Sequence, residues 1–233
     1  MKILSISDVE LPFIYSPQIQ ERFKDTDLVI SCGDLSYFYL EYIVSTLNRP
    51  MYYVRGNHAY DVEYGVAGER SHVWGATDLH RKVTSDAGLL LAGIEGCLVY
   101  NGGRFQYTQG DMWASVLSLA PVLLLNRLRY GRYLDVFVSH APPWGIHDLK
   151  DLPHQGIKAF RWLIDVFKPS LFLHGHIHVY RSGSTMATQV GSTMVINTFG
   201  FQETMIEKGK LIFPIHSTSQ GAGDKGVKEI SHA

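Results

Sequence analysis

The chain has 233 residues, of which 45% are hydrophobic and 18% charged, and its formal net charge is −1 at pH 7. This composition predicts a globular protein with a substantial core, and the near-zero charge argues against a nucleic-acid partner. No apolar run is long enough to span a bilayer or to act as a signal peptide, so we expect a cytoplasmic protein with no membrane attachment. Cys32 and Cys97 are expected to be buried, reduced thiols.

Short apolar, β-rich runs predict buried strands, because each run ends abruptly in a polar or glycine cluster. In chain order these strands cover residues 3–7, 28–32, 51–54, 135–139 and 171–173. Further strands are expected over 89–93, 98–100 and 193–197, with a hairpin over 204–213 that turns at 207–210.

Helical patterns lie between some of these strands, over residues 36–47, 111–129 and 156–167. Ser36 is the expected N-cap of the first helix, and Pro121 is expected to kink or split the second. Strands and helices alternate early and strands dominate late, which favours layered α/β with a mixed sheet or with two sheets packed face to face. Residues 217–233 contain no aromatic residue and predict a flexible tail, which leaves one domain over 1–216.

Polar clusters follow the carboxyl ends of several predicted strands, the edge where ligands bind in open α/β sheets. Their Asp, Asn and His side chains are ligands for divalent cations such as Mn²⁺, Fe or Zn²⁺. Most clusters, taken singly, are typical of turns and caps. The segment 175–178 favours a site by itself, because its two histidines project to the same side of an extended chain. In order, the clusters are Asp8, Gly33-Asp34, Gly56-Asn57-His58, His140 and Gly175-His176-Ile177-His178.

This ordered set resembles the signature of the calcineurin-like metallophosphoesterase superfamily, and residues 139–148 also resemble a bacterial subgroup of it. The resemblance implies a sandwich of two mixed β-sheets flanked by helices. It also implies two divalent cations bridged by Asp34, with Asp8 and His178 binding the first and Asn57, His140 and His176 the second. His58 is then expected to face the substrate, where it stabilises the phosphoryl group or protonates the leaving oxygen.

Two positions depart from the family pattern. Glu10 stands where the first motif has histidine; as a ligand it would favour a harder ion, so Mn²⁺ or Mg²⁺ is expected there rather than Zn²⁺. The alternative is that Glu10 points away and leaves a weak first site. Ala59 follows Gly-Asn-His where the family has an acid, so either Asp61 orients the His58 imidazole or activity is reduced.

Three further segments allow two interpretations each. The loop carrying His147, Asp148, Asp151 and His154 either contacts substrate or is pinned by its own polar groups. The aromatic run 37–39 is expected to pack its helix rather than stack on a leaving group. The apolar surface of the 111–129 helix is explained by core packing, with a homo-oligomer contact as the alternative.

The sequence thus predicts a metal-dependent hydrolase of phosphate monoesters or diesters that acts on a small phosphorylated substrate such as a nucleotide. Two cations clamp the phosphate, and a hydroxide bridging them attacks the phosphorus directly. Mn²⁺ is the favoured metal, with Fe, Zn²⁺ or Mg²⁺ as alternatives. The competing hypothesis keeps the fold and the metal pocket but assigns the chain a binding or scaffold role with impaired catalysis.

Overall fold

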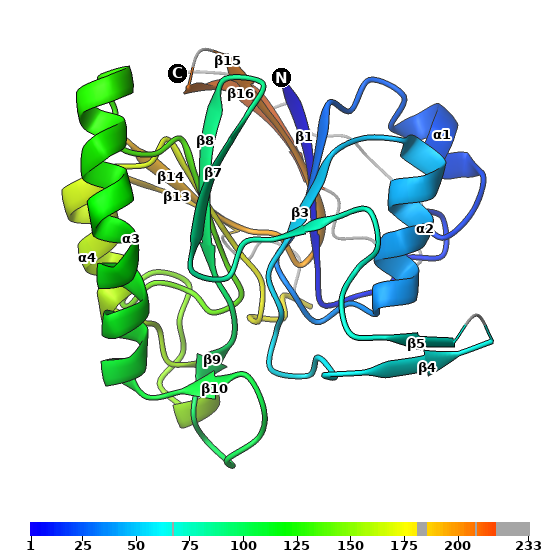
Figure 1. Cartoon of the computed structure of the whole chain (residues 1–233), viewed down its shortest axis with the longest axis horizontal. Helices are drawn as coiled ribbons and strands as arrows, with labels where there is room; N and C mark the ends of the chain where they lie inside the picture. Colours follow the sequence, from blue (N-terminus) through cyan, green and yellow to red (C-terminus); the bar gives the residue numbers. More distant parts are fainter. Residues whose placement is uncertain (67, 181–185, 208, 218–233) are drawn as a thin grey trace.

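Two six-stranded mixed sheets pack face to face, and helices cover both outer faces (Figure 1). The computed structural model describes residues 1–66, 68–180, 186–207 and 209–217, with side chains described as far as Ile212. The predicted sandwich flanked by helices is confirmed. The predicted tail, apart from Ser217, lies outside the described residues.

The first sheet runs in the order β16-β15-β1-β2-β3-β6. Strands β1, β2, β3 and β6 are parallel, whereas β15 and β16 form an antiparallel hairpin beside β1. The parallel strands therefore deliver their carboxyl ends to one edge. The bounds are β1 Lys2–Ser7, β2 Leu28–Ser31, β3 Met51–Tyr53, β6 Thr77–Asp78, β15 Gly200–Glu207 and β16 Lys210–Ser217.

The second sheet runs in the order β13-β14-β12-β11-β8-β7. Its four central strands are parallel, and β13 and β7 close the two sides in antiparallel fashion. The bounds are β7 Lys82–Asp86, β8 Leu89–Ile94, β11 Val136–Ser139, β12 Leu171–His174, β13 Ala187–Val190 and β14 Thr193–Asn197.

Alternating side chains of these strands fill three apolar layers. Ile30 of β2 and Val138 of β11 point into the layer between the sheets. Val29 faces the helices on the first sheet, and Phe137 those on the second. Burial on both faces explains why the strands appear in the sequence as near-continuous apolar runs rather than as an alternating pattern.

Helices α1 (Gln18–Arg22) and α2 (Tyr37–Leu47) cover the first sheet, and α3 (Gln109–Tyr130) and α4 (Lys158–Phe167) cover the second (Figure 1). Ser36 caps α2 as predicted, because its side chain accepts a hydrogen bond from the backbone N–H of Tyr39. The possibility that Pro121 splits the second predicted helix is wrong: α3 continues through it. Pro121 lies on the exposed side, so only one backbone hydrogen bond is lost while the buried side of α3 stays packed.

Small elements surround the carboxyl edge of the sheets; the sequence predicted none of them except a strand over 98–100, which the structure places at Cys97–Leu98. They include the hairpin β4 (Glu63–Gly65) and β5 (Gly68–Arg70), which projects below α2 in Figure 1, and the parallel pair β9 (Cys97–Leu98) and β10 (Gln106–Tyr107). A single 3-10 turn, Leu152–His154, lies in the loop after β11. In the described ranges, no helix is both long and apolar enough to cross a membrane.

Candidate metal centre

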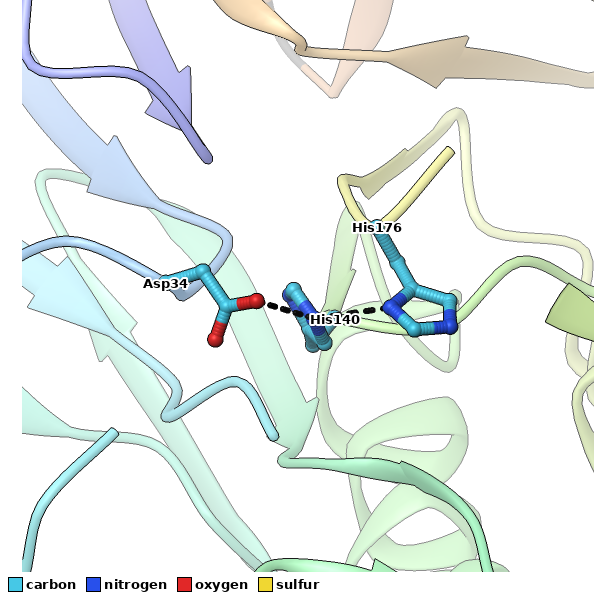
Figure 2. A group of neighbouring side chains, drawn as sticks. All are labelled: Asp34, His140 and His176. Atoms are coloured by element: carbon cyan, nitrogen blue, oxygen red, sulfur yellow. Dashed lines mark hydrogen bonds and ion pairs between the residues drawn. The ribbon is translucent and has the colours of Figure 1, made fainter. Parts of the chain in front are cut away.

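The parallel strands of both sheets bring their terminal polar residues to one place. Asp34 follows β2, His140 follows β11 and His176 follows β12. One ligand atom from each of these three side chains lies within 4.8 Å of the other two. Figure 2 shows His140 between Asp34 and His176, with its ring facing both. The first sheet thus contributes the carboxylate and the second sheet the two imidazoles.

His140 Nε2 is the centre of this group. It lies 3.2 Å from Asp34 Oδ2, 2.9 Å from Asn57 Oδ1 and 3.1 Å from His176 Nδ1. Four oxygen and nitrogen atoms that can ligate a metal therefore lie close together. Three of the residues that carry them are buried: Asn57, His140 and His176. Such a mixed set of carboxylate, amide and imidazole donors fits a divalent cation of the Mn²⁺, Fe or Zn²⁺ kind.

Backbone carbonyls orient the two imidazoles. His140 Nδ1 lies 2.8 Å from the carbonyl oxygen of Cys32, and His176 Nε2 lies 2.8 Å from that of Pro153. Because a carbonyl only accepts, each of these nitrogens carries a proton, so in the neutral imidazoles that bind a cation the opposite nitrogen would present its lone pair to the centre. The same contacts hold both rings in place.

The ionisable side chains of the site change one another's pKa values. Burial by itself would raise the pKa of Asp34, but the adjacent His140 and the backbone N–H of His58 outweigh it and lower that pKa to about 2. Burial would likewise lower the pKa of His140, yet Asp34 raises it to about 9. Burial and the neighbouring His140 lower the pKa of His176 to about 4. A cation bound between Asp34 and His140 would displace the proton that they share.

Glycines allow this close approach. A Cβ at Gly56 would lie 2.0 Å from Asp34 Oδ1, and one at Gly175 would lie 2.6 Å from Asp8 Oδ2. A Cβ at Gly33 would lie 2.8 Å from His140 Nδ1. The glycines of the three motifs are therefore needed for space around the ligands, and not only for turns.

Three of the predicted ligands have a strained backbone. Asp8, Asp34 and His176 have φ values of 65°, 55° and 67°, in the left-handed region that non-glycine residues rarely adopt. Such strain gathers at functional sites, where the surrounding structure fixes the conformation. Here each strained residue directly follows, or lies within three residues of, a strand end.

Asp8 and His178 lie beside the central group. The Asp8 carboxylate is buried and accepts the backbone N–H of His176 at 3.0 Å. His178 Nε2 lies 3.7 Å from Asp8 Oδ1, while its Nδ1 lies 2.9 Å from the Tyr180 hydroxyl. The nearby carboxylate of Asp8 raises the pKa of His178. Both side chains are of kinds that ligate divalent cations.

Glu10 and Asp61 make contacts outside the group around His140. Glu10 is exposed, and its carboxylate accepts hydrogen bonds from both the backbone N–H and the hydroxyl of Ser36. Asp61 forms an exposed ion pair with Arg104. His58 is exposed, and its backbone N–H donates to Asp34 Oδ1 at 2.9 Å. Ligation by Glu10 and support of His58 by Asp61 remain predictions.

One end of the loop after β11 lies beside the site, and the other end is held by its own polar contacts. The His154 ring lies 5.2 Å from that of His176, so this end of the loop borders the centre. His147 instead contacts His174 at 2.8 Å, and Asp148 accepts the backbone N–H of Gly156, so both pin the loop down. Tyr100, whose hydroxyl accepts from Asn57 Nδ2 at 3.2 Å, was not predicted, because a tyrosine in a polar loop carries no motif signal.

Comparisons with known proteins agree with this geometry. The sequence profile described as calcineurin-like phosphoesterase matches residues 1–180. The chain is similar to the crystal structure of TT1561 of Thermus thermophilus, with 16% identity over 91% of this chain and 96% of that one, and a TM-score of 0.61. A hypothetical protein from the same organism aligns with 15% identity over 92% and 97%, and a TM-score of 0.53. No curated protein sequence matches.

The profile covers well over half of the chain and includes all the residues of the metal centre. The two structural neighbours share the fold along nearly their whole length. The chain belongs to the calcineurin-like phosphoesterase family.

Proposed function

We propose that this chain hydrolyses phosphate monoesters or diesters with the help of two divalent cations, for which Mn²⁺ is the favoured identity. The observation that carries the proposal is the convergence of Asp34 Oδ2, Asn57 Oδ1 and His176 Nδ1 on His140 Nε2. A small phosphorylated compound, such as a nucleotide, is the proposed substrate.

Asp34, Asn57, His140 and His176 would hold one cation, and Asp8, Asp34 and His178 the other. Two cations held there would supply Lewis acidity toward the phosphate oxygens and, by lowering the pKa of a water shared between them, a hydroxide nucleophile. Asp34 suits the bridging role because its Oδ1 is held by the backbone N–H of His58 while Oδ2 faces His140.

His58 is the proposed acid for the leaving group. The residue is exposed, and its backbone N–H is tied to Asp34, which supports a position of the imidazole near a phosphate held at the site. Histidine is the side chain used most often for general acid–base catalysis. His58 would then protonate the leaving oxygen as its bond to phosphorus breaks.

The first test is hydrolysis of a chromogenic phosphodiester and a chromogenic phosphomonoester by metal-stripped protein, before and after Mn²⁺ is added. Turnover that appears only with metal, and is lost in Asp34→Asn, is the expected result. Asp165→Asn serves as the matched control, because Asp165 is exposed on α4 and pairs with Arg161. Metal-independent turnover, or full turnover in Asp34→Asn, would contradict the proposal.

A binding or scaffold role is the second candidate, and the position of Glu10 favours it. The carboxylate at the family's histidine position bonds Ser36 at the start of α2. Full metal occupancy with no turnover of either ester would favour this candidate. In that case the metal centre would serve to join the two sheets.

A further inference from the structure

Beside Asp34 and His58 lies a pocket of about 480 Å³, a size within the range of pockets that hold drug-sized ligands. Its wall is formed by the start of α2, the loop after His58 and the first strand of the β4–β5 hairpin. The candidate site and the pocket therefore share two residues. The lining residues that the argument uses are Asp34, Phe38, His58, Tyr60, Glu63 and Tyr64.

Aromatic rings dominate the wall of this pocket. Tyr60 and Tyr64 are 68% and 75% exposed, although tyrosine rings usually pack against other side chains. Phe38 is half-buried, and a Cβ at Gly65 would lie 2.5 Å from its ring, so the ring rests directly on the hairpin backbone. Aromatic faces that are open to a concave surface are typical of binding sites for apolar or planar groups.

Hydrogen bonds hold the pocket in shape. The Tyr37 hydroxyl donates to the backbone carbonyl of Tyr60 at 2.9 Å. The carboxylate of Glu63 accepts the backbone N–H of Tyr37 at 2.8 Å, which ties β4 to the first turn of α2. Arg55 donates to the Tyr37 hydroxyl at 3.0 Å and fixes that side chain in turn. The loop that carries the rings is thus anchored before any ligand arrives, and preorganisation favours binding.

The charge of the pocket restricts what it can hold. Among its lining residues in the described part of the chain, Asp34 and Glu63 are acidic and none is lysine or arginine. Ala59 adds only a methyl group to the wall. The nearby Arg70 guanidinium lies 5.4 Å from the centre of the Phe38 ring and pairs with Glu41. A second phosphate or a carboxylate would therefore meet no lysine or arginine among these lining residues, whereas an uncharged ring would contact apolar surface.

We propose that this pocket binds an uncharged aromatic group on the leaving side of the phosphoester, and that Phe38 and Tyr64 determine this specificity. His58 lines the pocket and is the proposed leaving-group acid, so the group it protonates would extend between these rings. The inference rests on the proposed function and adds the chemical class of the leaving group.

The test is calorimetric binding of two non-hydrolysable anions, phenylphosphonate and methylphosphonate, to the Mn²⁺-loaded protein. Both present the same phosphonate to the metals, so their ratio of dissociation constants reports the pocket alone. We expect phenylphosphonate to bind about tenfold or more tightly than methylphosphonate. Phe38→Ala and Tyr64→Ala should each bring the ratio toward one and leave methylphosphonate binding unchanged.

Tyr64→Ala guards against a folding defect, because the Tyr64 ring is largely exposed, and Tyr130→Ala on α3 is the matched control for losing an exposed tyrosine. The phosphonate analogues of adenosine monophosphate and ribose phosphate, which cannot be hydrolysed, are then compared in the same way. A preference in this second pair would assign a nucleobase, and a preference in the phenyl pair alone would assign a ring attached directly at the phosphate; both support the proposal.

The two failures are distinguishable. Equal binding within both pairs would overturn the aromatic pocket and leave the proposed hydrolase standing. Binding of none of the anions would overturn the phosphate site itself, and the pocket proposal with it. An unchanged phenyl preference in both ring variants would show that Phe38 and Tyr64 do not determine specificity.

Discussion

The residues at and around the candidate metal centre fall into two halves that are held very differently. We call Asn57, His140 and His176 the buried half, since their exposed fractions are 8%, 0% and 6%. We call Glu10, His58 and His178 the exposed half, since each lies at the surface. Main-chain carbonyls fix both imidazoles of the buried half, whereas Glu10 bonds a helix cap and His178 a tyrosine hydroxyl.

Under the proposed function, this difference predicts that the two cations would not bind equally. Ligands that are fixed before binding lose little conformational freedom, so a cation at the buried half should bind more tightly. The other proposed cation would depend on His178, which lies at the surface and contacts the Tyr180 hydroxyl, together with Asp8 and Asp34. Substitutions in each half test this asymmetry.

His140→Ala should have the largest effect, because it removes the atom on which the other donors converge. We expect loss of the tighter cation and a fall in kcat/KM on the order of 10³-fold, since metal stabilisation of the transition state amounts to several kcal/mol. Metal content and turnover are measured together. His72→Ala, an exposed histidine, is the control, and unchanged metal content in His140→Ala would contradict the asymmetry.

Gly56→Ala should break the same half without removing a ligand. The added Cβ would lie 2.0 Å from Asp34 Oδ1 and must displace that carboxylate. We expect metal affinity to fall roughly 10- to 100-fold, as when the support of a ligand is lost. Gly110→Ala is the matched control, since its Cβ would meet only Thr108 Oγ1 at 3.5 Å. Titration with Mn²⁺ measures both variants, and equal affinities would count against a tightly fitted Asp34.

Glu10→Ala tests the exposed half. Because Glu10 bonds Ser36, its loss should weaken the more loosely bound cation by no more than about tenfold. It should also lower the free energy of unfolding by about 1 kcal/mol, because the start of α2 loses an acceptor. Calorimetric metal titration and denaturant unfolding measure the two effects. A much larger loss of the second cation would show that Glu10 moves from Ser36 to ligate it.

Asp61→Ala should have the smallest effect. Asp61 and Arg104 form an exposed pair, and such pairs contribute about 0–1 kcal/mol to stability. We therefore expect kcat to change by less than about threefold, as in the control Arg104→Ala, when both are assayed with the chromogenic diester. A fall in kcat that is specific to Asp61→Ala would instead assign it to orienting His58.

The candidate ligands Asp34, His140 and His176 could be brought together from the sequence, whereas the contacts of Glu10 and Asp61 could not, for a physical reason. Asp34, His140 and His176 follow apolar strands within three residues, and parallel strands must bring their ends to one edge. The partner of Glu10, by contrast, is 26 residues away on the cap of another element. No local pattern encodes that contact, and the same holds for the pair of Asp61 with Arg104.

The helix α3 and the β4–β5 hairpin also depend on packing that local sequence patterns do not encode. Burial of one side of α3 outweighs the local cost of Pro121, which local propensity alone overstates. The hairpin strands are three residues each, and their residues are partly exposed, so no apolar run marks them. Its position against Phe38, which shapes the aromatic pocket, depends on Gly65 lacking a side chain.

The ligands of the buried half come from both sheets of the sandwich: Asn57 follows the first sheet's β3, and His140 and His176 follow strands of the second. A cation bound there would act as a cross-link between segments more than 80 residues apart in the chain, in a protein whose cysteines Cys32 and Cys97 are both free. At a metal concentration one hundred times the dissociation constant, such a link adds about 2.7 kcal/mol to the free energy of unfolding. A higher concentration of free metal would therefore slow proteolysis of this protein, because it lowers the population of the unfolded chain.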